Sequence, residues 1–249
     1  MTAALPNRIP TDSLNYRSGD PRQRLIVALD VSSAAAAQKI VAAVGDSALT
    51  YKVGMQLYTA VGPQIVRDLV ASGRRVFLDL KYHDIPNTVG AAVAEAEKLG
   101  VSMLTIHAAG STKMVRAAVE AAKVRPDLMV LAVTVLTSMD GHDLETIGIR
   151  GSMEDSVVRL ATIALGQGCQ GVVTSAREAF TLRAELGDRF AIVTPGVRPA
   201  GCSVEDQIRV VTPAEAIASG ASHIVVGRPI TEAADPGAEA RAILGQIRG

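Results

Sequence analysis

The sequence predicts an α/β fold made of a single domain, a closed (β/α)8 barrel of the TIM type. Three observations lead to this prediction. Short apolar runs rich in β-branched residues recur along the chain, segments with helical spacing separate them, and eight such pairs fit within 249 residues. Strands that alternate with helices form parallel sheets, and eight units in this length are typical of a closed barrel.

The expected strands are apolar runs bounded by polar residues or glycine, at residues 25–29, 49–53, 76–80, 103–106, 129–135, 171–174, 191–194 and 224–226. The expected helices are Ala-rich segments with helical spacing, at residues 34–44, 64–72, 88–99, 112–123, 154–167, 176–186, 213–219 and 236–247. Residues 1–20 hold prolines and polar side chains, so we expect an N-terminal arm there and the catalytic barrel domain over residues 21–249.

An open, doubly wound sheet is the alternative α/β architecture. Such sheets carry a Gly-x-Gly-x-x-Gly turn after the first strand when they bind dinucleotides, whereas Val31-Ser32-Ser33 follows the first strand here. The sequence therefore does not support a dinucleotide site, and we expect the closed barrel.

The composition argues against several classes of function. Lys plus Arg and Asp plus Glu balance at 25 each, so the chain lacks the positive charge typical of nucleic-acid binding. The two cysteines, Cys169 and Cys202, have no Cys-x-x-Cys spacing, which indicates a reducing compartment without a disulfide framework or zinc site. The longest apolar run, residues 128–136, is too short to span a membrane, and no signal peptide is recognisable. We therefore expect a cytoplasmic protein with neither nucleic-acid nor membrane partners.

The third expected strand runs into a concentration of charge, in the stretch LDLKYHDIPNT at residues 78–88. Side chains alternate between the two faces of a strand, and the apolar positions of the first three strands must face the helices. The opposite positions then place charged side chains inside the barrel, near the carboxyl end of each strand: Asp30, Lys52, Asp79 and Lys81. Active sites of such barrels lie at this end. Buried ion pairs seldom stabilise a fold, because the cost of desolvating the charges often exceeds the energy of their attraction. The pattern therefore favours a catalytic site.

A second polar motif occurs at the ends of the last two strands. The stretches VTPGVRP (193–199) and IVVGRPI (224–230) each combine a glycine with an arginine: Gly196 with Arg198, and Gly227 with Arg228. The loops after strands seven and eight of such barrels commonly bind phosphate through backbone N–H groups, and arginine offers a planar fork of donors. Each glycine alone would indicate a turn, and each arginine a surface charge. The repetition favours an anion site.

Metal binding is the weaker hypothesis. Asp79, His83 and Asp84 lie close together in the sequence, but Lys81 between them supplies a competing cation. His107 lies near a strand end, and His142 and His223 lack ligand-like spacing. We expect no metal ion.

Seven further blocks accompany LDLKYHDIPNT in a fixed order: IVALD, YKVGMQLY, TIHAAG, AVTVLTSM, VTPGVRP, DQIRVVTPAEAI and VVGRPIT. Together they closely resemble the bacterial branch of the orotidine 5'-phosphate decarboxylase family, whose core motif is Asp-x-Lys-x-x-Asp. The resemblance extends from residue 25 onward and leaves out the N-terminal arm.

This resemblance implies a lyase that decarboxylates orotidine 5'-phosphate to UMP and CO2, the last step of de novo pyrimidine (UMP) biosynthesis. It also implies a homodimer without a cofactor. By the matching motif, Lys81 is the proton donor to C6 and belongs to a catalytic set with Asp79, Lys52 and Asp84. Asp84 and Thr88 are implied to reach into the partner's site, and Asp30 to contact the ribose.

The same resemblance implies which residues bind the rest of the nucleotide. Either Thr137 or Ser138, in the segment LTSM, lies near the pyrimidine. The residues implied to grip the phosphate and close over the nucleotide are Arg198, Gln207, Gly227 and Arg228.

Three alternatives remain open at this point. Asp79 either repels the substrate carboxylate or positions the two lysines. The chain could also be a Mg²⁺-dependent sugar-phosphate decarboxylase or aldolase-type barrel that shares the Asp-x-Lys-x-x-Asp strand. A catalytically silent nucleotide-binding barrel is the third alternative, although binding alone would not need the full set of charges.

Overall fold

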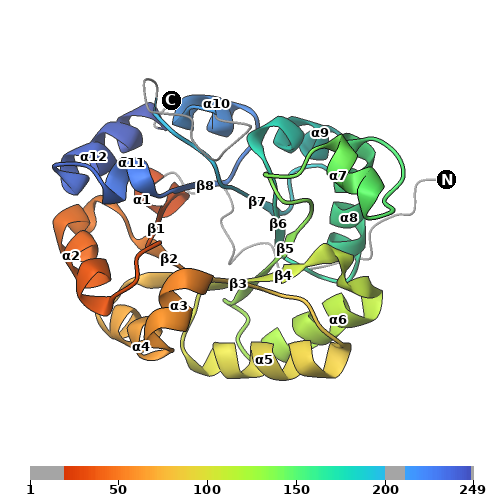
Figure 1. Ribbon diagram of the computed structural model, residues 1–249, viewed down its shortest axis with the longest axis horizontal. Helices are drawn as coiled ribbons and strands as arrows, with labels where there is room; N and C mark the ends of the chain where they lie inside the picture. Colours follow the sequence, from red (N-terminus) through yellow and green to blue (C-terminus); the bar gives the residue numbers. More distant parts are fainter. Residues whose placement is uncertain (1–19, 200–210, 248–249) are drawn as a thin grey trace.

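A computed structural model of the protein describes residues 20–199 and 211–247. Its centre is a closed barrel of eight parallel strands that follow one another in chain order, as Figure 1 shows in a view onto the ring. The strands are β1 (Leu25–Ala28), β2 (Thr50–Gly54), β3 (Arg75–Tyr82), β4 (Met103–His107), β5 (Met129–Val133), β6 (Gly171–Val173), β7 (Ala191–Thr194) and β8 (His223–Val226). The predicted fold class is confirmed.

Helices surround the barrel on the outside (Figure 1). They are α1 (Pro21–Arg24), α2 (Ala34–Val44), α3 (Met55–Val61), α4 (Gln64–Ala71), α5 (Pro86–Lys98), α6 (Ser111–Ala122), α7 (Gly141–Thr146), α8 (Met153–Gly166), α9 (Ala176–Leu186), α10 (Pro213–Ala218), α11 (Arg228–Thr231) and α12 (Pro236–Gln246), with short 3-10 turns at Gly45–Ser47 and Ala108–Gly110. All the expected helices are present. The short helices α1, α3, α7 and α11 were not predicted, because each is only four to seven residues long.

Capping residues set where several helices begin. Ser152 starts α8 and Thr212 starts α10, each with its hydroxyl oxygen accepting the backbone N–H three residues later. The acidic side chain at that third position bonds back to the cap, which completes a capping box. Pro86, at the first turn of α5, fits a position where its missing N–H costs nothing. This helix therefore begins two residues before the predicted start.

The apolar core has two layers. Alternate strand residues such as Ile26, Ala28 and Phe77 fill the barrel interior, whereas Leu25 and Val27 belong to the larger cluster between strands and helices. Burying these two sets removes apolar surface from water and drives the barrel to close. The alternation predicted for the first three strands is the one that the structure has.

One strand departs from regular pairing. Leu78 pairs with Leu104, but Tyr82 pairs with Ile106, so β3 contains two more residues than β4 between these two pairs. Lys81, inside this bulge, has a backbone φ of 52°, in the left-handed region that residues other than glycine normally avoid. Such a conformation costs about 1–3 kcal/mol and persists only where surrounding contacts hold it. β3 also ends two residues later than predicted, so the bulge lies at the carboxyl end of the barrel.

The predicted N-terminal arm, residues 1–20, lies outside the described residues except for Asp20, whose carboxylate accepts the Arg22 N–H at the start of α1. The arm and domain boundaries therefore stay predictions. Within residues 20–199 and 211–247, none of the helices is both long enough and apolar enough to cross a membrane.

Candidate active site

A cavity of about 540 Å³ lies at the carboxyl end of the strands. Residues of β1, β2 and β3 line one part of its wall, and the segments after β7 and β8 line another. This volume suits a ligand the size of a nucleotide. The cavity therefore lies between the two polar motifs that the sequence singled out.

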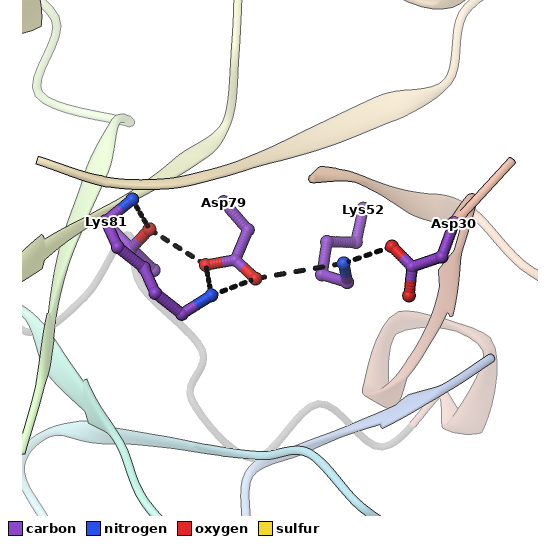
Figure 2. A network of polar contacts seen from close by, with 5 residues as sticks. Asp30, Lys52, Asp79 and Lys81 are labelled. Carbon is purple, nitrogen blue, oxygen red and sulfur yellow. Dashed lines mark hydrogen bonds and ion pairs between the residues drawn. The ribbon is translucent and has the colours of Figure 1, made fainter. Parts of the chain in front are cut away.

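Charged side chains of opposite sign alternate along one wall, in the order Asp30, Lys52, Asp79, Lys81 (Figure 2). Lys52 Nζ lies 2.8 Å from Asp30 Oδ1 and 3.8 Å from Asp79 Oδ2. Lys81 Nζ lies 2.9 Å from both carboxylate oxygens of Asp79. Three adjacent strands, or the residues just after them, therefore contribute to one continuous row of charges.

Burial increases toward the middle of this row. The side chains of Lys52 and Asp79 are each 12% exposed, that of Lys81 is 24% exposed, and that of Asp30 is 52% exposed. Charges at such depth interact more strongly than charges in water, and each inner member has an oppositely charged neighbour. The row can therefore present ammonium groups to a ligand without leaving a buried charge unpaired.

The bulge in β3 brings Lys81 back toward Asp79. Two residues on one face of a regular strand have Cα atoms about 6.6 Å apart along the strand, with side chains standing side by side. The left-handed backbone at Lys81 instead accompanies an ammonium that contacts both oxygens of one carboxylate. Thr105 on β4 completes the arrangement: its hydroxyl accepts the Lys81 backbone N–H and donates to Asp79 Oδ1, each at 2.9 Å.

Gly54, at the end of β2, leaves room for the Lys52 side chain. A Cβ added at Gly54 would lie 2.8 Å from Lys52 Nζ and 3.2 Å from Asp30 Oδ1. Real side chains do not tolerate the first of these separations, so any larger residue would displace the ammonium. Sequence reasoning missed both Gly54 and Thr105. The one available signal for Thr105 was a hydroxyl in the apolar strand MLTIH.

The second part of the wall combines backbone with arginine side chains. Gly196 has a φ of 74°, which only glycine adopts at low cost, and it allows a sharp turn after β7. Arg198 is buried, and its backbone N–H donates to Val211 O at 3.0 Å, which joins this turn to the approach to α10. Gly227 caps α11, and Arg228 follows it, half-buried. All four sequence-predicted residues of VTPGVRP and IVVGRPI line the cavity.

Other predicted residues lie in different surroundings. Thr137 lines the cavity, whereas Ser138 is exposed and is not part of its lining. Asp84 and Thr88 are also exposed and lie outside the cavity wall, with Asp84 Oδ1 accepting the N–H of Ile85. Gln207 lies outside the described residues.

Two histidines lie beside the charged row. The rings of His83 and His107 are 5.1 Å apart between centroids. Burial is the largest cause of the lowered pKa of His107, and the electrostatic effects of His83 and Lys81 act in the same direction, so this ring stays neutral near pH 7. Within the described ranges, no three His, Cys, Asp or Glu side chains are grouped so as to hold a metal ion.

Comparison with known proteins adds to this geometry. Residues 23–243 match the model of the family described as orotidine 5'-phosphate decarboxylase / HUMPS. A relative named orotidine 5'-phosphate decarboxylase from Afipia carboxidovorans is 51% identical, covering 92% of this chain and 96% of the relative. One of the same name from Moorella thermoacetica is 48% identical, covering 91% and 92%.

Solved structures agree. A crystal structure of orotidine 5'-phosphate decarboxylase from Lactobacillus acidophilus is 37% identical and superposes with a TM-score of 0.82, covering 91% of this chain and all of that one. That of the Pyrococcus horikoshii enzyme is 26% identical with a TM-score of 0.75, covering 90% and 99%. The chain belongs to the orotidine 5'-phosphate decarboxylase / HUMPS family.

Proposed function

We propose that this protein is an orotidine 5'-phosphate decarboxylase, a lyase that converts orotidine 5'-phosphate to UMP and CO2 in pyrimidine biosynthesis. The observation that carries the proposal is the row Asp30–Lys52–Asp79–Lys81 on the cavity wall of a chain 51% identical to a protein of that name. The family also includes HUMPS proteins, but the relatives compared above at 48% and 51% identity carry the decarboxylase name.

Lys81 is the group that we assign to the chemical step. When the bond between C6 and the carboxylate breaks, CO2 leaves and the electron pair stays on C6, in the plane of the pyrimidine ring. An ammonium beside C6 stabilises that pair electrostatically and then transfers its proton to it, which forms UMP. Arginine would be a poorer donor because its proton is held too tightly. Solvent then restores the proton on Lys81.

Asp79 holds the two lysines in place, in this proposal, rather than acting mainly by repelling the substrate carboxylate. Its carboxylate lies 2.9 Å from Lys81 Nζ and 3.8 Å from Lys52 Nζ, so it is the shared partner of both ammonium groups. Prearranged charges of this kind need no reorganisation when the transition state forms. Asp30, which is more exposed and contacts Lys52, is assigned to the ribose.

The opposite wall is assigned to the phosphate. Arg198 and Arg228 supply guanidinium donors, and Gly227 permits a close approach of the backbone to the ligand. Gln207 is assigned to the same group on the family resemblance alone. Thr137, on the cavity wall, is assigned to the pyrimidine in preference to Ser138.

A homodimer completes the proposal, with Asp84 and Thr88 entering the partner's site. Both residues are exposed and neither lines the cavity of its own chain, which supports a role outside that chain. Mixing Lys81→Ala with Asp84→Ala chains tests this: one of the two sites in each hybrid is then intact. With random exchange of equal amounts, about half of the dimers are hybrids and each hybrid has one intact site, so about a quarter of the wild-type activity should be restored. No rescue, with hybrids confirmed by mass spectrometry, contradicts the shared site.

The direct test is to incubate the protein with orotidine 5'-phosphate and follow the ultraviolet absorbance as UMP forms. We expect turnover that survives exhaustive EDTA treatment, because the proposal includes neither metal nor cofactor. Activity that is abolished by EDTA and restored by Mg²⁺ would support the metal-dependent alternative. Binding without turnover would identify the catalytically silent barrel. A cytoplasmic location remains a prediction.

A further inference from the structure

One fully buried hydroxyl connects the two most important residues of the charged row. Thr105, the middle residue of β4, is 0% exposed, and its hydroxyl contacts β3 twice. The Lys81 backbone N–H donates to Oγ1, and Oγ1 donates to Asp79 Oδ1, each across 2.9 Å. A hydroxyl has a single proton, and an N–H can only donate, so the directions of both bonds are fixed. The Thr105 proton therefore points at the carboxylate.

The backbone at Lys81 needs such a partner. In a regular parallel ladder, strand N–H groups bond carbonyl oxygens of the neighbouring strand. The pairing between β3 and β4 shifts between Leu78 and Tyr82, and the Lys81 N–H bonds the Thr105 side chain instead. That side chain thus satisfies a backbone donor at a residue whose φ of 52° is disfavoured.

We propose that Thr105 is a positioning residue for decarboxylation, an inference that rests on the proposed function. It holds the left-handed backbone that directs the Lys81 side chain, and it fixes one oxygen of the carboxylate that the Lys81 ammonium contacts. The Lys81 Nζ and the Asp79 carboxylate therefore keep one relative position before the substrate arrives. Small misplacements of a catalytic group cost much of the rate, so the loss of this hydroxyl should affect the chemical step more than binding.

The chain contains a matched control. Thr50, at the start of β2, is also 0% exposed, and its Oγ1 has no hydrogen-bond partner in the part of the chain that the structure describes. Thr105→Val and Thr50→Val remove the same hydroxyl from equally buried strand positions and keep the β-branched shape. Only the first removes contacts to Lys81 and Asp79.

The experiment measures kcat and KM for orotidine 5'-phosphate in wild type, Thr105→Val, Thr105→Ser and Thr50→Val. We expect Thr105→Val to lower kcat by on the order of 100-fold while KM changes by less than about threefold. Thr105→Ser, which keeps the hydroxyl, should retain most of kcat, and Thr50→Val should resemble wild type. If Thr105→Val does not fold, Thr105→Cys carries the test, because a thiol is a weak donor and acceptor of similar size.

An unchanged kcat in Thr105→Val, an equal loss in Thr50→Val, or no recovery in Thr105→Ser overturns the inference. A crystal structure of Thr105→Val gives a second readout that does not depend on activity. We expect Lys81 to leave its left-handed conformation or its Nζ to separate from Asp79, and unchanged positions would overturn the inference. A wild-type protein that is inactive on orotidine 5'-phosphate refutes the proposed function instead, so the two failures are distinguishable.

Discussion

The two ends of the barrel interior treat buried polar groups differently. At the carboxyl end, Asp79 is buried and has two ammonium groups and a hydroxyl around it. At the amino end, His223 is 5% exposed, and its Nδ1 has no hydrogen-bond partner among the described residues. Burial, followed by the positive charges of Arg75 and Arg24, lowers the pKa of His223 to about 3, so this ring stays neutral.

Similar depth therefore leads to opposite outcomes, and the neighbours decide between them. Desolvation disfavours the charge of a buried group that has no oppositely charged neighbour, whereas oppositely charged neighbours compensate for desolvation. Functional residues of such barrels lie at the carboxyl end, and residues at the amino end contribute to stability. Substitutions at the two ends should accordingly separate into effects on rate and effects on folding.

The largest effect is expected from Lys81→Ala, which under the proposed function removes both the cation beside C6 and the proton donor. Each of these contributions is worth on the order of 10²–10⁴ in rate, so kcat/KM should fall by at least about 10⁴-fold. Lys39→Ala, an exposed lysine on α2, is the matched control and should keep wild-type kinetics. A comparable loss from Lys39→Ala, or a Lys81→Ala variant that stays active, would contradict the role assigned to Lys81 at the carboxyl end.

Arg228→Ala should have the next largest effect, on the order of 10²–10³-fold in kcat/KM for orotidine 5'-phosphate. Binding energy at the phosphate can be used to assemble the charged row, although the phosphate does not react. The measurement compares orotidine 5'-phosphate with the phosphate-free nucleoside, for which the loss should be small. Equal losses on both substrates would reject the role of Arg228 in phosphate binding.

Gly54→Ala tests the space around Lys52 and should lower kcat/KM by roughly 10²-fold, because the added Cβ would lie 2.8 Å from Lys52 Nζ. The control is Gly166→Ala at the end of α8, where a Cβ would meet no atom within 4 Å. Steady-state kinetics and thermal unfolding of both variants separate the effect on the site from the effect on stability. Full activity in Gly54→Ala would mean that Lys52 tolerates displacement.

The smallest effect on activity, and a clear one on stability, is expected from His223→Leu. In the unfolded wild-type chain, His223 has its ordinary pKa of 6.5 and takes up a proton as the pH falls below that value. In the folded chain its pKa is about 3, so the ring stays neutral over most of this range. Stability is thus present above pH 6.5 and is lost as pH falls, by about 2 kcal/mol at pH 5. Urea unfolding from pH 7.5 to 5 should show a shallower pH dependence in the variant, with kcat unchanged. Parallel curves for the two proteins would contradict the neutral, buried state of His223.

Much of the fold was predictable because its signals are local. The apolar runs located all eight strands to within about two residues at each end, and their alternation placed Ile26 and Ala28 inside the barrel and Leu25 and Val27 outside. Four short helices, of four to seven residues each, were not predicted, since such segments carry little periodicity; α10, with six residues, was predicted. The ordered motifs predicted the family, which the comparisons confirm.

The barrel, the inward faces of its first three strands and the charged residues at one end of it could be predicted from the sequence alone. The tertiary structure decided how those residues meet. Strand alternation alone would place Lys81 beside Asp79 on the same face of the strand, two residues further along. The shifted pairing of β3 with β4 accompanies a closer contact, with Lys81 Nζ 2.9 Å from both carboxylate oxygens of Asp79. The fold also brings Thr105 into hydrogen-bond contact with Asp79, although the two residues are 26 positions apart in the chain. The reason is physical: periodicity is a property of one strand, whereas register, bulges and cross-strand hydrogen bonds depend on two strands folded against each other.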